Sequence, residues 1–350
     1  MGISKWLNGI AIFSILILAG AAPVAGAAAV PGRPLEKVTI GVSPVMSSAA
    51  RFISAEKGYF AEQGIDPVIE PFKASGAKMV PFLATGELDV GGGNVTAGLY
   101  NAIASGIPVK IVADKGTVSP NHGYLALLVR KDLVDSGRYK TYKDLKGMTL
   151  ATTAKGVSQE IVTERYLKSV GLGMADINLV TLAYQDMNIA FANKSLDATV
   201  QIEPFVAAAV RQGLAVRIEG NDVIYPNQQS AVIIYSPSFV EKRPTVARAF
   251  MVAYVQALRD YNDAFEKGKA KAKAEIVDIL TKHNAVKDKT VLDQAVPAGL
   301  HPDGALNVQS LTEDAKWFLE HGYLKSMPDM NSIVDLSYVE HASKILGPYH

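Results

Sequence analysis

The stretch LDVGGGNVTAGLYNAIASG, residues 88–106, carries the signals that decide the fold. A short apolar run leads into three consecutive glycines, and an alanine-rich helical run follows and stops at Gly106. Asn94 and Thr96 are residue types that cap the start of a helix, and a glycine commonly ends one. Glycines between a strand and a helix would let backbone N–H groups approach a ligand at the helix start. The stretch therefore predicts a strand, a glycine loop and a helix that together form one wall of a small-molecule site.

The composition of the 350-residue chain is that of a folded globular protein, because 49% of its residues are hydrophobic and 20% are charged. The length allows two domains of ordinary size. With a net charge of +1 and no basic run interleaved with aromatic residues, nucleic acid is not expected as a partner. The absence of cysteine excludes thiol catalysis, cysteine-ligated metals, disulfides and a lipid-modified N-terminal cysteine.

The N-terminus has the three parts of a secretory signal peptide. Lys5 supplies the positive start, residues 10–19 the apolar centre, and small residues around 25–29 the cleavage site. We expect cleavage near residues 27–29, which removes a signal peptide of residues 1–27 and leaves a periplasmic protein. The alternative is an uncleaved membrane anchor, because residues 10–30 carry no charge and are long enough to span a bilayer.

Strand and helix signals alternate along the chain in two blocks. In the first block the expected strands are residues 38–42, 68–70, 88–90 and 108–113. Short connections and apolar strands without clean alternation predict a parallel sheet covered on both faces. Residues 130–224 repeat this architecture with a different sequence, and the longer apolar runs at 124–129 and 230–235 join the two blocks.

These patterns predict an α/β fold with two lobes arranged as a clamshell. Each lobe is expected to hold a mainly parallel sheet flanked by helices, and two crossing strands join the lobes. A ligand cleft would lie between the lobes, lined by the starts of helices. The expected division places residues 36–124 and 231–350 in the first lobe, 130–224 in the second, and 125–129 and 225–230 in the hinge crossings.

An ordered series of short motifs resembles a known family. The motifs are EKGYF (56–60), QGI (63–65), GELDVGGGN (86–94), AIASGIPV (102–109), DMNIAF (186–191), LDA (196–198) and EP (203–204). Over residues 38–265 this series resembles the nitrate/sulfonate/taurine-type substrate-binding proteins of bacterial ABC transporters. The resemblance implies a type II periplasmic-binding-protein fold, ligand capture by lobe closure, and delivery to an ABC permease and its ATPase in the inner membrane. It also implies a small polar or anionic organic ligand of the sulfonate, aromatic acid or pyrimidine class.

The resemblance implies ligand contacts on residues 43–48, 94–96, 155–159 and 201–203. Side-chain donors at several helix starts would hold an anion without arginine, and Lys155 would add a full charge. Glu203 would accept a hydrogen bond from an N–H group of the ligand. The same residue types also serve as ordinary helix caps. The candidate ligand-binding residues are Ser43, Met46, Ser47, Ser48, Asn94, Val95, Thr96, His122, Lys155, Ser158, Gln159, Tyr184, Gln201 and Glu203.

An exported or membrane-anchored enzyme is the alternative. Residues 91–93 begin like a dinucleotide-binding fingerprint, and Asp114 stands where a ribose-binding acid would, although Thr96 replaces the third glycine. Such a protein would be an oxidoreductase. The six histidines include no close pair and no H-E-x-x-H motif, so no metal is expected. We expect no catalytic residues and no cofactor, and we expect a monomer whose partners are its ligand and the transporter.

Overall fold

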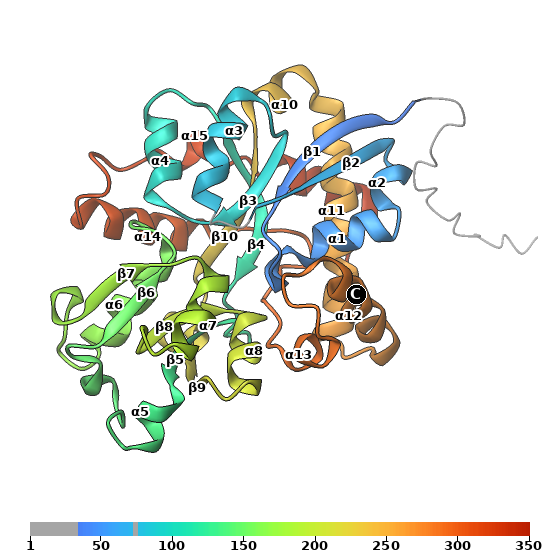
Figure 1. Cartoon of the computed structure of the whole chain (residues 1–350). Helices are drawn as coiled ribbons and strands as arrows, with labels where there is room; N and C mark the ends of the chain where they lie inside the picture. The colour runs from blue at the N-terminus through green and yellow to red at the C-terminus, as the bar shows by residue number, and fades with distance from the viewer. Residues whose placement is uncertain (1–33, 73–75) are drawn as a thin grey trace, which may run out of the picture.

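Two five-stranded sheets form the centres of two lobes (Figure 1). The computed structural model describes residues 34–72 and 76–350, so the expected signal peptide and its cleavage site lie outside the described residues. The first sheet has the order β2-β1-β3-β10-β4 and the second the order β7-β6-β8-β5-β9. In each sheet one strand, β10 or β5, runs antiparallel to its neighbours. The expected fold of two mainly parallel sheets flanked by helices is therefore confirmed.

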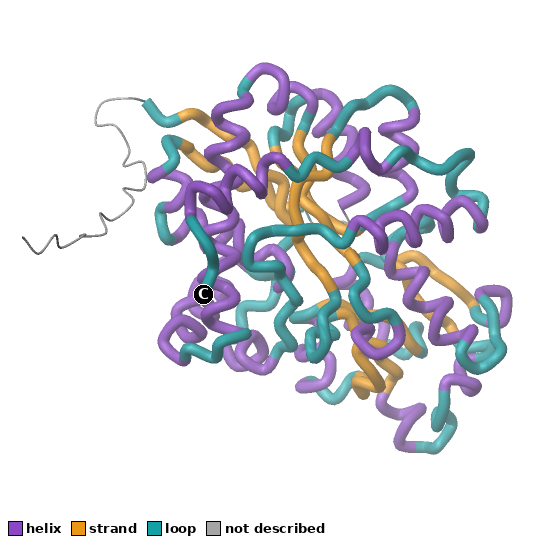
Figure 2. Tube along the Cα trace, turned by 180° about the vertical axis from the view of Figure 1, so that it is seen from behind, coloured by secondary structure: helices purple, strands orange, loops and turns teal. Residues whose placement is uncertain are grey.

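Both sheets consist of short strands, which are coloured orange in the rear view of Figure 2. Those of the first sheet are β1 (Glu36–Val42), β2 (Ile65–Pro71), β3 (Val90–Asn94), β4 (Lys110–Thr117) and β10 (Gln229–Tyr235). Those of the second are β5 (Leu125–Arg130), β6 (Thr149–Thr152), β7 (Asn178–Thr181), β8 (Ala198–Ile202) and β9 (Ala215–Gly220).

Helices cover both sheets. In the first lobe before the crossing they are η1 (Met46–Ser48), α1 (Ala49–Glu56), α2 (Tyr59–Glu62), η2 (Gly76–Met79), α3 (Val80–Thr85) and α4 (Ala97–Ala104). The middle of the chain adds α5 (Lys131–Asp135), η3 (Tyr142–Leu145), α6 (Ser158–Lys168), η4 (Met174–Asp176), α7 (Tyr184–Ala192), α8 (Phe205–Arg211) and α9 (Asn221–Ile224). The C-terminal part contains α10 (Pro237–Lys242), α11 (Pro244–Phe265), α12 (Ala270–His283), α13 (Lys289–Gln294), α14 (Val308–Glu320), α15 (Met330–Ile333) and α16 (Ser337–Leu346).

The glycine run lies inside strand β3 and not in a loop after it, so the expected glycine loop is wrong. Gly92 pairs with Ile233 of the antiparallel strand β10. A Cβ atom on Gly92 would lie 3.0 Å from Ile233 Cδ1 and 3.1 Å from Arg51 Nη1. The glycines are needed because neighbouring side chains pack directly against this strand. A dinucleotide loop is thereby excluded at this position.

The helix after β3 begins and ends as the sequence predicts. Thr96 is the N-cap of α4, and its Oγ1 accepts a hydrogen bond of 3.1 Å from the N–H of Leu99. Gly106 follows the helix with φ of 90°, a left-handed conformation that glycine adopts at little cost. Local sequence therefore determines the ends of this helix even though it does not predict the position of the glycines.

The chain passes between the sheets twice, within residues 118–124 and 221–228. Residues 125–129, expected at a hinge crossing, belong to strand β5, which pairs with β8 and β9 of the second sheet. The expected division of the residues into two lobes stays a prediction.

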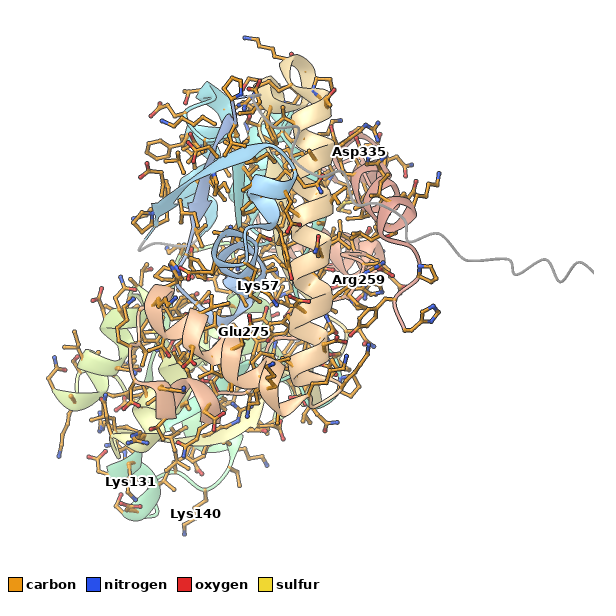
Figure 3. The ribbon with its side chains drawn as sticks, turned by 90° about the vertical axis from the view of Figure 1, so that its right-hand side faces the viewer. Lys57, Lys131, Lys140, Arg259, Glu275 and Asp335 are labelled. Carbon is orange, nitrogen blue, oxygen red and sulfur yellow. The ribbon has the colours of Figure 1, made fainter. Side chains whose placement is uncertain are left out.

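The C-terminal helices pack on the first lobe and also reach the second. Helix α11 contacts α1, α12 and α16, and Lys57 at the end of α1 lies 2.6 Å from Asp260 and 3.5 Å from Glu275 (Figure 3). Helix α14 contacts α4 of the first lobe and α6 of the second (Figure 1). There Trp317 Nε1 donates a hydrogen bond of 2.5 Å to Glu164 of α6. Helix α14 therefore ties the lobes together.

None of the helices in residues 34–72 and 76–350 combines the length and the apolar character that a membrane span requires.

Candidate functional site

A pocket lies between the two lobes. The first lobe lines it with Ser43, Pro44, Val45, Phe72, Gly93, Asn94 and Lys115, and the second with Tyr184, Gln185, Ile202 and Phe205. Its empty volume is about 400 Å³, which includes open solvent at the mouth. A small ligand in this pocket would therefore touch both lobes.

Lys115 of β4 brings its ε-amino group into this pocket. The residue is only 2% exposed, and its Nζ donates a hydrogen bond of 2.9 Å to Ser47 Oγ. It forms no ion pair with any residue in the described part of the chain. Burial lowers the pKa of Lys115 well below its usual value, and the nearby Arg51 guanidinium lowers this pKa further. Lys115 is thus a buried basic group that no carboxylate contacts in the described part of the chain.

Asp114 precedes Lys115 in β4 and its charge raises the pKa of Lys115, but its carboxylate forms its hydrogen bonds with other groups. Its carboxylate accepts hydrogen bonds from the N–H groups of Gly116 and His301, both at 2.7 Å, and from Gln229 Nε2 at 2.6 Å. Asp114 therefore holds the loop before α14, and the structure gives it no position from which to bind a ribose.

Arg51 of α1 is a buried cation that bonds to the segment around the end of β1 and the start of α1. Its Nη1 donates a hydrogen bond of 2.9 Å to the carbonyl of Gly41, and its Nη2 donates one of 2.9 Å to Ser48 Oγ. Ser48 Oγ in turn donates to the carbonyl of Ser43 at 2.6 Å. Burial lowers the pKa of Arg51 to about 10, so the guanidinium remains charged at neutral pH. Arg51 and Ser48 thereby position the loop that carries Ser43 and Ser47.

The second wall of the pocket is joined to the first by a side-chain hydrogen bond. Asn94 Nδ2, at the end of β3, donates to the hydroxyl of Tyr184 at 3.1 Å. Burial raises the pKa of Tyr184 to about 12, so the hydroxyl stays neutral. Gln201 does not line the pocket, but its Nε2 donates to the Tyr184 carbonyl at 2.9 Å and to Asn188 Oδ1 at 3.1 Å. Gln201 therefore supports the helix that presents Tyr184.

The starts of α4 and α6, expected to face a ligand, bond to each other. The N–H of Ala97 donates to the carbonyl of Gly156 at 2.8 Å, and the N–H of Ser158 donates to the carbonyl of Val95 at 3.1 Å. Thr96 forms an isolated bridge with Val157 across the lobes. Free N–H groups at helix starts need acceptors, and the facing lobe supplies them. The structure thus places Val95, Thr96 and Ser158 in a contact between the lobes and outside the pocket lining.

Four further candidates also lie outside the pocket lining. Met46 is buried, and its N–H donates to the carbonyl of Glu203 at 3.2 Å. Gln159 is buried within the second lobe, where its Oε1 accepts from the N–H of Thr153 at 2.9 Å. Lys155 is exposed. His122 contacts the carbonyl of Pro297 at 3.1 Å through Nδ1, and Glu266 at 2.8 Å through Nε2, which raises the pKa of His122.

Glu203 is buried at the end of β8 and bonds to protein groups. Its Oε2 accepts from the N–H of Ala207 at 3.0 Å, and its Oε1 accepts from the N–H of Val296 at 3.2 Å. Arg217 Nη1 lies 3.5 Å from Oε1. Burial outweighs these donors and raises the pKa of Glu203 to about 7. The carboxyl group therefore links the second lobe to the C-terminal segment.

Sequence reasoning missed Lys115, Arg51, Phe72 and Phe205. A signal for Lys115 was present, because it comes two residues after the apolar run 108–113, and ligands bind near the carboxyl ends of parallel strands. Arg51 had no such signal, because an arginine on an amphipathic helix is usually exposed. Among the residues that the structure describes, no group of His, Asp or Glu is arranged to hold a metal ion.

Comparisons with known proteins give the family. The sequence model of the NMT1-like family matches residues 32–281, which is more than half of the chain. A protein of Escherichia coli K12 named for binding aliphatic sulfonates is 27% identical over 52% of this chain and 54% of its own length. The nitrate import ATP-binding protein NrtC of Synechocystis is 26% identical over 68% of this chain and 37% of its own length. The chain thus spans about half or less of these two relatives.

Solved structures give the fold. The alkanesulfonate-binding protein SsuA of Xanthomonas axonopodis superposes with a TM-score of 0.70 and 19% identity, over 87% of this chain and 99% of that one. The periplasmic nitrate-binding protein NrtA of Synechocystis superposes with a TM-score of 0.74 and 14% identity, over 89% of both chains. Both neighbours are named as binding proteins. The chain belongs to the NMT1-like family and has the fold of the periplasmic sulfonate- and nitrate-binding proteins, which confirms the resemblance seen in the sequence.

Proposed function

We propose that this chain is the substrate-binding protein of an ABC importer and that it captures a small organic anion, a sulfonate or an aromatic acid, between its lobes. Family membership and the two-lobed fold support the importer role. In that role the protein is exported to the periplasm and delivers its ligand to a membrane permease with its ATPase. The uncharged pyrimidine class fits the pocket less well, because it offers no negative charge to Lys115.

The observation that carries the anionic ligand is the buried Lys115. A buried ammonium costs several kcal/mol unless an opposite charge or hydrogen bonds compensate it, roughly as for other buried ions. Ser47 takes one of its three N–H donors. A ligand oxygen in the pocket would accept another and bring the missing negative charge. Asn94 and Tyr184 add polar groups beside it.

The apolar lining supports an organic ligand over a bare inorganic ion. Phe72, Ile202 and Phe205 line the same pocket as Lys115. An alkyl or aryl group packed on these side chains would lose water-exposed apolar surface, worth about 25 cal/mol per Å². Because Ile202 and Phe205 belong to the second lobe and Lys115 to the first, such a ligand would stabilise the closed arrangement of the lobes.

The test is binding by the purified protein to methanesulfonate, ethanesulfonate, benzenesulfonate, benzoate, nitrate and uracil. We expect at least one organic anion to raise the thermal midpoint and to give a saturable heat in calorimetry. Lys115→Met should weaken that binding by about tenfold to a hundredfold, the value of a hydrogen bond to a charged group. The exposed Lys143→Met is the matched control and should bind normally.

Three results would contradict the proposal. Binding of uracil alone would exclude an anionic ligand. Unchanged affinity in Lys115→Met, with an intact thermal transition, would exclude Lys115 as the anchor. Chemical conversion of any bound compound by the purified protein would show an enzyme.

A further inference from the structure

We propose that ligand capture takes up one proton from solution, and that Lys115 Nζ receives it as the anion enters the pocket. The inference rests on the proposed function and deepens it, because it makes the affinity of the same site depend on pH. In the empty pocket Lys115 would be a neutral amine, and in the occupied pocket an ammonium paired with the ligand.

Among the residues that the structure describes, no carboxylate contacts the Lys115 amine. On α1, Arg51 is itself fully buried, and it donates to the Gly41 carbonyl and to Ser48 Oγ. On the same strand, the Asp114 carboxylate accepts hydrogen bonds from the backbone N–H groups of Gly116 and His301. Ser47 supplies the one acceptor that Lys115 contacts in the described chain, and a hydroxyl carries no charge.

The remaining titratable groups around this cluster are tyrosines. Tyr184 faces the pocket from α7, and Tyr254 of α11 donates to the carbonyl of Asp114 at 2.7 Å. Burial raises the pKa of both hydroxyls, so both are neutral at pH 7 and neither offsets a positive charge. The Asp114 carboxylate, which bonds to other groups, raises the pKa of Lys115, but burial and the Arg51 guanidinium lower this pKa by more.

Desolvation and repulsion both favour the neutral amine in the empty pocket. Burial of an ammonium without a partner lowers its pKa, and the guanidinium of Arg51 lowers it further. Arg51 keeps its charge, because its own pKa falls only to about 10. Of the two buried cations, Lys115 is therefore the one that gives up its proton.

An anion reverses this balance when it enters. A sulfonate is ionised at every pH of interest, so it brings one negative charge and releases no proton. Its attraction favours the charged form of the amine. In this step the neutral Lys115 amine takes one proton from solvent and pairs, as an ammonium, with the bound sulfonate. The new N–H bond is the only covalent bond that changes. At any pH above the pKa of Lys115 in the empty pocket, affinity should therefore fall up to tenfold for each added pH unit.

Proton uptake is measured by calorimetry at pH 8 with the tightest-binding of methanesulfonate, ethanesulfonate and benzenesulfonate. Tris and triethanolamine serve as the two buffers, because their ionisation enthalpies differ and because sulfonate buffers would compete for the site. We expect close to one proton taken up per ligand, and a dissociation constant that rises between pH 6 and pH 9.

Variants assign the proton to Lys115. Lys115→Arg keeps a permanent charge, so its binding should lose the proton uptake, whereas Lys143→Met should retain it. Glu203→Gln should also retain it, which separates Lys115 from the other buried group that titrates near the lobe contact.

The outcomes separate the two proposals. If no sulfonate binds the wild-type protein, the proposed function fails and this inference with it. If a sulfonate binds without proton uptake, or if Lys115→Arg binds with the uptake unchanged, only this inference is overturned. Should Lys115→Arg fail to fold or bind, the proton count of the wild-type protein and of Glu203→Gln still decides.

Discussion

Replacing Glu203 with glutamine should remove a large part of the pH dependence of folding stability. The Glu203 carboxyl group is buried between β8 and the C-terminal segment, where it accepts from the N–H groups of Ala207 and Val296. Glutamine has a similar shape and keeps one oxygen acceptor, but it never ionises. The variant therefore separates the cost of the buried charge from the loss of shape.

The size of the effect follows from the pKa of Glu203. Burial raises this pKa from 4.5 to about 7. Each pKa unit between the native and the unfolded state corresponds to about 1.36 kcal/mol of folding free energy. Protonation of Glu203 therefore stabilises the native state over the unfolded state by about 3 kcal/mol relative to the ionised form. Because the native state binds more protons than the unfolded state between pH 4.5 and 7, this stability is fully present below pH 4.5. It is lost as pH rises through about 7.

Urea unfolding of both proteins at pH 4.5, 6, 7 and 8 measures the effect. We expect the stability of Glu203→Gln relative to wild type to rise by about 3 kcal/mol from pH 4.5 to pH 8. The exposed Glu62→Gln is the matched control for the loss of one carboxylate. A difference between wild type and Glu203→Gln that stays constant over this range would refute the assignment of a raised pKa to this buried group.

Three further substitutions test the packing of the lobes, each by urea unfolding. Gly92→Val should destabilise the protein by about 1–3 kcal/mol, because its Cβ would lie 3.0 Å from Ile233; unchanged stability would contradict the close packing of β3. Thr96→Ala should cost about 1 kcal/mol through loss of the α4 cap, and Thr96→Ser should restore most of it. Glu164→Gln should cost about 1–3 kcal/mol, because Trp317 and His321 lose a charged acceptor; equal stability at pH 7 would show that α14 does not hold the lobes through this residue.

Local signals in the sequence predict much of the fold. Apolar runs indicate where the strands lie, and helical spacing of apolar residues indicates the helices. Thr96 and Gly106 mark the ends of α4 as expected. Pro81 stands in the first turn of α3, where its missing N–H costs nothing. These features depend on residues a few positions apart, which is why they can be predicted without the tertiary structure.

The candidate site was predicted in part. Ser43, Asn94 and Tyr184 line the pocket, because they follow strands or begin helices at the facing edges of the two sheets. Ser158 and Thr96 stand at the same edges, but their helix starts bond across the lobes. The choice between facing a ligand and facing the other lobe depends on how the lobes meet, which no local pattern contains.

The sequence by itself determined the α/β class, the two blocks of alternating strands and helices, and the family. Only the tertiary structure decided that the glycines lie within a strand, and that the buried Lys115 and Arg51 bond to the neighbouring residues Ser47 and Ser48. The reason is physical. Strand and helix signals arise from neighbours along the chain, whereas the burial of a charge depends on residues more than sixty positions apart, as Ser47 and Lys115 are.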